Sequence, residues 1–274
     1  MNPVSVKVQV PVELLSYVQQ HKLVKTFQVF MYMKCMSASK MRNTDAAFTG
    51  IAGALAIKDR RTLNKHINRL AKLNWIGFNP ETGEYYIRGI GFIRKQQGFK
   101  KRKAATFYFK DVKEMQAFVA GSIISANIKA QQYFWEVAPR TRRKSATMNM
   151  DVARQDGSCP SDAMTQKPAY YGIGVKGIAK LLFCKATRAC ELKQEAEKAG
   201  FIKTRKKFRE IGTYHGRNHK LKEAYGYAHP NKVKAIRFKT VTRKKKKFVV
   251  MLEQLHDEIK PNVPFKKVKR FLHL

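Results

Sequence analysis

Apolar and polar residues alternate at the beginning of the chain. Valine occupies every second position from 4 to 10, and polar residues lie between the valines. A period of two predicts a half-buried strand. Pro11 suits the first turn of a helix, which we expect over Val12–Gln20. The denser apolar stretch Phe27–Met36 places large side chains at helical spacing and predicts a helix in the core.

A pattern of two helices follows in 50–73. Small residues surround Ile51 and Leu55 and predict a short helix that other elements can approach closely. Asp59 is a favourable N-cap for a second helix. The apolar positions of that second helix recur at steps of four, three and three, which is one helical face: Leu63, Ile67, Leu70 and Leu73.

A hairpin is predicted directly after the second helix. Trp75-Ile76 and Tyr85–Ile87 favour strands, and Pro80–Gly83 favours the turn between them. The order of short helix, tight turn, second helix and hairpin resembles a winged helix-turn-helix domain over about Phe27–Ile90. Asn74 stands where such domains usually have glycine, and asparagine also tolerates a left-handed helix end.

The same pattern returns in 172–215. Gly177-Ile178-Ala179 repeats Gly50-Ile51-Ala52, and Gly200-Phe201-Ile202 matches Asn74-Trp75-Ile76. Between these anchors the first copy has one more residue, so we expect its turn to be one residue longer. The apolar positions again recur at helical spacing: Ala189, Leu192, Ala196 and Ala199. This second copy also resembles a winged helix.

Strands are expected beyond the second copy. Phe201–Ile211 predicts a strand, a basic turn and a returning strand, which together would form a wing. Ala235–Phe238 and Phe248–Met251 predict two further strands around a cluster of basic residues. Leu252–Ile259 predicts a helical turn or two.

A long helix is predicted between the two copies, over Asp111–Ala138, and a short strand precedes it at Phe107–Phe109. Asp111 and Glu114 have the spacing of a capping box. The apolar stripe of this helix must be covered. We favour packing within the chain, and the alternative is a homodimer surface. Residues 139–167 are polar and poor in large apolar side chains, which predicts a linker.

The sequence therefore predicts a helix-rich α+β fold with two winged helix-turn-helix domains, joined by the long helix and the polar linker. We expect the N-terminal domain, including the long helix, over 1–138 and the linker over 139–167. The C-terminal domain with its basic tail is expected over 168–274.

The charge balance points to a polyanionic partner. The 274 residues include 56 Lys and Arg against 19 Asp and Glu, a formal net charge of +37. A surface with this excess repels itself unless anions neutralise it. Lys and Arg along a phosphate backbone gain free energy through counterion release, whatever the base sequence. The charge disfavours an enzyme for small neutral metabolites and favours nucleic acid.

We expect double-stranded DNA as the partner and sequence-specific binding as the function. Two winged helices in a small basic chain resemble the architecture of plasmid and phage replication initiators and transcription regulators. Two alternatives stay open. The charge equally suits a protein that condenses DNA without specificity or is packaged with a genome. RNA binding is the second alternative, and the scarcity of aromatic stacking platforms argues against it.

The second helix of each copy supplies the predicted base contacts, because Arg and Lys pair with guanine, and Asn and Gln with adenine, in the major groove. In the first copy the outward positions are Arg60, Arg61, Asn64, Lys65, Asn68 and Lys72. In the second copy they are Lys185, Thr187, Arg188 and Gln194. The predicted wing adds Lys203, Arg205, Lys206, Lys207 and Arg209. We expect Glu191 to pair with a neighbouring Lys rather than with cytosine.

Metal and nucleotide chemistry find little support. His215 and His219, with His229 nearby, have no acidic neighbours except Glu210 and Glu223, so we favour phosphate contacts over a metal site. No GxxxxGK[ST] phosphate-binding loop occurs. We therefore expect no catalysis, no cofactor, no metal and no small-molecule substrate.

The location expected is cytoplasmic and nucleoid-associated, or the virion if the protein is packaged. No apolar run is long enough to span a membrane, and the N-terminus lacks the features of a signal peptide. The four cysteines form no CxxC pair and are expected to be reduced, mostly buried thiols: Cys35, Cys159, Cys184 and Cys190.

Overall fold

The chain is a mixed α+β protein with small antiparallel sheets. The computed structural model describes residues 6–37, 39–137, 170–214, 236–243 and 246–267. They form two compact units. Unit 1 takes in the described residues of Met1–Ala169, Val175–Lys203 and Lys260–Leu274, and unit 2 takes in those of Tyr170–Gly174 and Thr204–Ile259.

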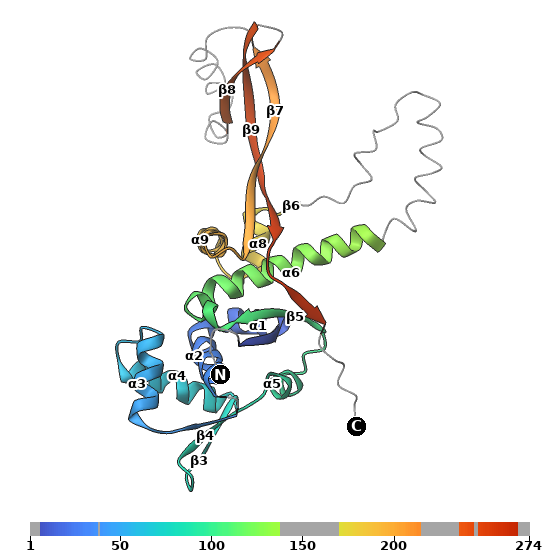
Figure 1. Ribbon diagram of the computed structural model, residues 1–274. Coiled ribbons are helices and arrows are strands. Elements are labelled where there is room, and N and C mark those ends of the chain that lie inside the picture. Colours follow the sequence, from blue (N-terminus) through green and yellow to red (C-terminus); the bar gives the residue numbers. More distant parts are fainter. Residues whose placement is uncertain (1–5, 38, 138–169, 215–235, 244–245, 268–274) are drawn as a thin grey trace. The chain divides into compact units, whose positions relative to one another are not determined.

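Unit 1 is largely helical (Figure 1). Its described helices are α1 (Val12–Gln20), α2 (Val24–Met36), α3 (Asp45–Ala54), α4 (Arg60–Lys72), α5 (Ile90–Gln96), a 3-10 helix (Phe109–Glu114), α6 (Met115–Val137), α8 (Val175–Leu181) and α9 (Ala186–Lys198). Helices were predicted at each of these places except α5 and the 3-10 helix. The helix expected from Asp111 begins at Met115 instead, since the chain first makes the 3-10 turn.

Two three-stranded sheets complete unit 1. The first has the order β1-β5-β10, with β1 (Lys7–Pro11), β5 (Lys103–Tyr108) and β10 (Phe265–Lys267). The second has the order β2-β4-β3, with β2 (Lys40–Arg42), β4 (Glu84–Ile87) and β3 (Ile76–Asn79). The hairpin predicted after α4 is confirmed, because Ile76 pairs with Ile87 and Asn79 with Glu84 around the turn.

The core of unit 1 holds α4 against α2. Trp75, directly after α4, is fully buried. Its ring centroid lies 6.1 Å from that of Phe27 and 5.6 Å from that of Phe30, both on α2. Burying an aromatic side chain of this kind contributes about 2–3 kcal/mol. The apolar end of α4 is therefore one of the anchors that place this helix.

Helix α6 is the central element of the core. Residues 117–126 are buried on every side, which is the pattern of a helix enclosed by other elements. The ring centroid of Phe118 lies 5.1 Å from that of Phe107 on β5. It lies 5.6 Å from that of Phe201, which follows α9 in the sequence. The apolar stripe of α6 is covered by other elements of the same chain, as we favoured. A homodimer stays a prediction.

The units divide the chain differently from the domain boundaries expected at 138 and 168. Helices α8 and α9 pack against α6, so they belong to unit 1 together with α3 and α4. The expected linker, 139–167, lies outside the described residues. Unit 2 consists of the short strand β6 (Tyr171–Gly172) with its neighbours and of the described residues after Lys203, up to Ile259.

Unit 2 is a twisted antiparallel ribbon (Figure 1). Its sheet has the order β6-β9-β7, and β8 also pairs with β9. Strands β8 (Ile236–Arg243) and β9 (Lys246–Pro261) confirm the two strands predicted in the tail. Strand β7 (Ile202–Tyr214) is continuous, so the turn expected within Phe201–Ile211 is wrong.

The helical turn expected at Leu252–Ile259 is also wrong, because this segment belongs to β9. Strand β9 has partners in β6, β7 and β8. Pairing with neighbouring strands satisfies backbone N–H and C=O groups that a local helix would otherwise bond. The apolar residues of this segment therefore do not form a helical face.

Gly121→Ala is expected to destabilise the protein, although alanine favours a helix by up to about 1 kcal/mol. A Cβ at Gly121 would lie 2.6 Å from the Cβ of Phe201 and 3.4 Å from the Cβ of Ala196. These atoms sit close to the backbone, so helix packing must shift at a cost of about 1–3 kcal/mol. Urea unfolding measures the loss.

The matched control is Gly50→Ala in α3, where a new Cβ meets nothing within 4 Å. This control should be as stable as the wild-type protein or slightly more stable. Equal stability of Gly121→Ala and the wild-type protein would contradict the close approach of α6 to Phe201.

Candidate nucleic-acid interface

Two pairs of helices, α3–α4 and α8–α9, share one backbone geometry. In each pair the first helix is followed by a residue in the left-handed region, Ala56 or Phe183, both with φ of 51°. The second helix has 13 residues in each pair. It is followed by another left-handed residue, Asn74 with φ of 56° or Gly200 with φ of 78°. The repeat predicted from sequence is thus also a repeat of backbone conformation.

The turn hydrogen bonds repeat as well. The N–H of Ile57 donates to the carbonyl of Ala52, and the N–H of Cys184 donates to that of Ala179. From the left-handed residue to the N-cap of the second helix, the first turn is one residue longer than the second, as predicted. Asn74 adopts the left-handed conformation at the helix end, as predicted, in the place where glycine is usual.

Helix α4 presents a polar arc to solvent. Its N-cap is Asp59, whose carboxylate accepts the N–H of Arg61 at 2.9 Å, as predicted. Leu63, Ile67 and Leu70 are buried on the opposite face. Every outward residue predicted on this helix is exposed: Arg60, Arg61, Asn64, Lys65, Asn68 and Lys72.

Most of this arc makes no side-chain hydrogen bond or ion pair within the described part of the chain. Arg60 is the exception, since its Nη2 lies 2.5 Å from Oδ1 of Asp45 and its guanidinium lies 5.6 Å from the Phe48 ring centroid. The other donors keep their hydrogen-bonding capacity available to a partner. The arc therefore brings together cationic and amide groups with little internal neutralisation.

Helix α9 differs from α4 in its outward face. Its predicted residues are also exposed: Lys185, Thr187, Arg188 and Gln194. Arg188 donates to Glu191 at 2.7 Å and to Glu195 at 3.1 Å. These carboxylates, Glu191 first, raise the pKa of the Arg188 guanidinium. Glu191 thus pairs with a cation as expected, although that cation is an arginine.

The basic residues of β7 divide into two groups. Lys203 and Lys206 are exposed and make no side-chain hydrogen bond or ion pair within the described ranges. Arg205 and Lys207 are also exposed but bind Glu258 of β9, with contacts of 2.6 and 2.8 Å. The side chain of Arg209 lies outside the described residues.

Glu258 is a buried carboxylate that pairs with two cations of β7, and the sequence did not predict this. Its side chain is 7 % exposed, and hydrogen bonds from Lys207 and Arg205 lower the pKa of its carboxyl. Arg205 also lies over the ring of Tyr170, with 4.3 Å to the centroid. Glu258 is far from Arg205 in sequence, so no local pattern signals the contact.

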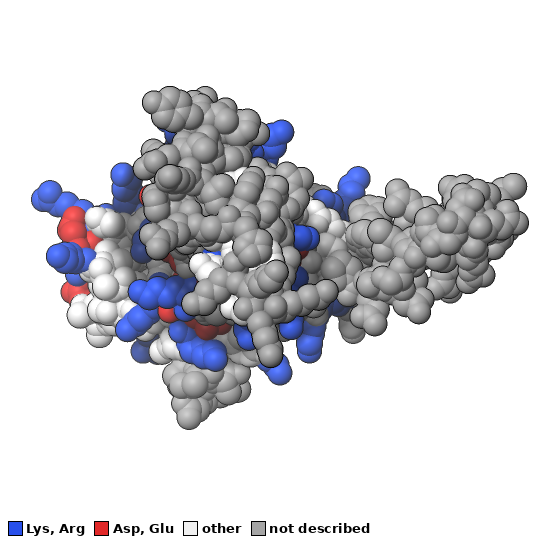
Figure 2. All heavy atoms as spheres, turned by 90° about the horizontal axis from the view of Figure 1, so that it is seen from above, with Lys and Arg blue, Asp and Glu red and all other residues white. Residues whose placement is uncertain are grey.

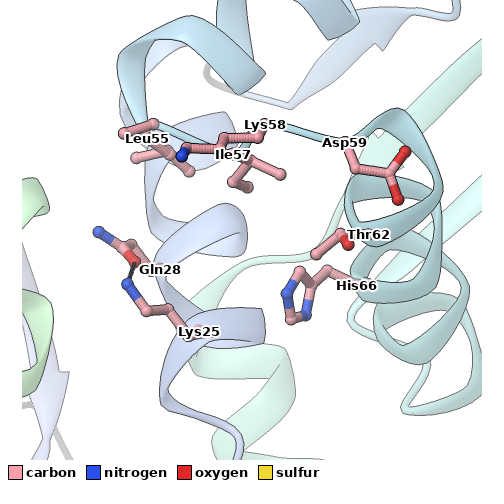
Figure 3. Close-up of a pocket in the computed structure, with 9 residues that line it drawn as sticks. Lys25, Gln28, Leu55, Ile57, Lys58, Asp59, Thr62 and His66 are labelled. Carbon is pink, nitrogen blue, oxygen red and sulfur yellow. Dashed lines mark hydrogen bonds between the residues drawn. The ribbon is translucent and has the colours of Figure 1, made fainter.

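A pocket of about 310 Å³ lies between α2, the turn that precedes α4, and α4 itself (Figure 3). Its walls come from all three elements: Lys25, Gln28, Leu55, Ala56, Ile57, Lys58, Asp59, Thr62 and His66. Nδ1 of His66 lies 3.0 Å from Oγ1 of Thr26 on α2. Burial, followed by the charges of Arg69, Lys25 and Lys65, lowers the pKa of His66.

Basic side chains are spread over the described part of the face in Figure 2, with few acidic side chains between them. Within the described residues, no group of three His, Cys, Asp or Glu could hold a metal ion. The histidines His215, His219 and His229 and Cys159 lie outside these residues. Cys35, Cys184 and Cys190 are free, half-buried thiols, so they are less buried than expected.

None of the described helices combines the length and apolarity that a membrane crossing requires. Comparison of the chain with protein-family models, with curated proteins and with solved structures finds no match. The assignment of function therefore rests on the geometry and charge of the chain itself.

Acidification is expected to destabilise the protein through His66. Because its pKa is lowered in the folded state, the unfolded chain binds the proton more readily. The stability contributed by neutral His66 is present above the ordinary pKa of 6.5 and is lost as the pH falls through the lowered value. Urea unfolding at about pH 7.5 and about pH 5.5 should show this loss.

His66→Gln should show a smaller decrease between the two pH values than the wild-type protein. His21→Gln, at an exposed position, is the control and should keep the full decrease. The same pH dependence in His66→Gln and the wild-type protein would exclude His66 as its origin.

Proposed function

We propose that this protein binds double-stranded DNA at specific sequences. In this proposal α3, α4 and the β3–β4 hairpin form a winged helix-turn-helix domain, and α4 is its recognition helix. The observation that carries the proposal is the exposed arc of α4, which presents Arg61, Asn64, Lys65, Asn68 and Lys72 with no acidic residue on the helix.

The dimensions of α4 suit the major groove. Thirteen residues give a helix about 20 Å long, and the groove is about 12 Å wide, enough to admit an α-helix. Arg61 and Asn64 lie in the first half of the helix, the part that contacts base edges in helix-turn-helix proteins. Arginine can form two hydrogen bonds to guanine, and asparagine can form two to adenine. The arc therefore has the side chains needed to discriminate between bases.

The basic residues outside α4 supply affinity without base specificity in this proposal. Lys203 and Lys206 of β7 are exposed cations of the kind that bind phosphates. The second helix pair, α8 and α9, forms a second helix-turn-helix in this proposal, without the wing that was predicted after it. The function that follows is to mark a DNA site for replication initiation or transcription control, as in plasmids and phages.

The net charge of +37 also supports a second function, condensation or packaging of DNA without sequence preference. The two functions differ in the role of α4. A condensing protein needs only its charge, whereas a sequence-specific protein needs the side chains of α4 in their places. RNA binding is distinguished by competition between duplex DNA and structured RNA at physiological salt.

Selection from random duplex oligonucleotides should enrich one sequence motif. The variants Arg61→Ala and Asn68→Ala should each reduce the preference for that motif over random duplex by roughly 5- to 150-fold, because each removes one base contact. Binding to the motif and to random duplex, measured by fluorescence anisotropy, gives this ratio.

The control is Lys113→Ala, which removes one exposed charge far from α4 in sequence and should leave the ratio unchanged. No enriched motif would favour the condensing function. A motif that survives both α4 substitutions would contradict the assignment of α4 as the recognition helix.

Affinity for any duplex should fall steeply with salt. Lys206→Ala should weaken binding to all sequences alike and reduce the slope of log K against log salt by about 0.9, since one phosphate contact is lost. The enriched motif should not change. A change of motif in this variant would assign Lys206 to base recognition instead.

A further inference from the structure

The two helix pairs share their backbone geometry, but their second helices differ in net charge. Helix α4 carries five Lys or Arg and no Asp or Glu, so these charges sum to +5. Helix α9 carries three Lys or Arg and three Glu, so its charges sum to zero. The difference cannot come from packing alone, because most of these residues are exposed on both helices.

Two carboxylates of α9 lie beside the exposed arginine of this helix. Glu191 and Glu195 flank Arg188, and the side chains of these three residues are 52 %, 41 % and 46 % exposed. Exposed ion pairs of this kind add little stability. Their consequence is electrostatic, since they neutralise the guanidinium and place two negative charges beside it.

The remaining cations of α9 do not restore a positive arc. Lys193 is 8 % exposed, on the side of the helix where Leu192 and Ala196 are also buried. Lys198 lies in the last turn, away from the N-terminal part that enters a groove. The N-terminal part of α9 therefore offers Lys185, Thr187 and a neutralised Arg188.

The other side of α9 has a structural role. Ala189, Leu192 and Ala196 are fully buried, and α9 packs against α6, where Gly121 admits Phe201 at close range. Small residues on α9 and a glycine on α6 allow the helices to approach closely. The two pairs share the left-handed residues and the length of the second helix. They differ in the charged side chains that the second helix exposes to solvent.

We infer that α4 is the recognition helix of this protein and that α9 is not. This inference rests on the proposed DNA-binding function and limits it. Each chain inserts one helix into one segment of the major groove, and the second helix pair is a scaffold packed on α6. Arg188 and Gln194, predicted from sequence to contact DNA, then make no base contact.

The test compares matched variants of the two helices in the full-length protein. Arg61→Ala in α4 and Arg188→Ala in α9 each remove one exposed arginine. Gln194→Ala is the second α9 variant and removes no charge. Selection from random duplexes and anisotropy titrations at fixed salt are carried out on each variant and on the wild-type protein. Circular dichroism confirms that all of them fold.

Arg61→Ala should reduce preference for the motif by roughly 5- to 150-fold. Arg188→Ala and Gln194→Ala should enrich the same motif as the wild-type protein, with affinities within about twofold. The double variant Glu191→Gln/Glu195→Gln frees Arg188 and raises the sum of charges on α9 from zero to +2. It should bind random duplex more tightly and leave the motif unchanged.

A motif that loses bases in Arg188→Ala or Gln194→Ala, while the wild-type motif is clear, overturns this inference and leaves the proposed function standing. A wild-type protein that enriches no motif overturns sequence-specific binding, and this inference with it. The two failures are therefore distinguishable in one experiment.

Discussion

The packing around α6 is the constraint on which unit 1 depends. Helix α6 contacts elements from both halves of the sequence: α1 and α2 from the first half, and α8 and α9 from the second. Phe118 lies between Phe107 and Phe201 and joins the β1-β5-β10 sheet to the end of α9. Helix α6 thus packs directly on the second helix pair and on α2, and α2 in turn contacts α3 and α4 of the first pair.

This arrangement leaves the outward faces of α4 and α9 free to differ. Each helix buries one apolar face, α4 mainly against α2 and α9 mainly against α6, and a left-handed residue follows the end of both helices. The exposed positions carry no such requirement. Helix α4 exposes cations and amides, whereas the exposed arginine of α9 pairs with two glutamates.

Acidic residues are scarce in this chain, so their places are informative. Asp45 holds Arg60 beside α3, Glu191 and Glu195 hold Arg188, and Glu258 holds Arg205 and Lys207. Glu258 is almost fully buried, and a buried carboxylate is tolerated because two cations and their hydrogen bonds compensate for its lost hydration. The described cations of β7 thus divide into those that pair with Glu258 and those that face solvent.

The sequence by itself determined the local geometry of both helix pairs. The Asp59 cap, the helical spacing of Leu63, Ile67 and Leu70, and the left-handed residue after each second helix depend on neighbours within a few positions. The exposed arc of α4 follows from that spacing, and its residues were predicted for this reason.

Only the tertiary structure decided how these parts combine. The fit of Phe201 against Gly121 and the pairing of Arg205 with Glu258 join residues far apart in the chain, and no local pattern encodes such contacts. The same holds for β7 and β9, where pairing with other strands prevailed over a local turn and a local helix. Long-range packing and strand pairing therefore assigned α9 to the core of unit 1 and determined which cations stay unpaired.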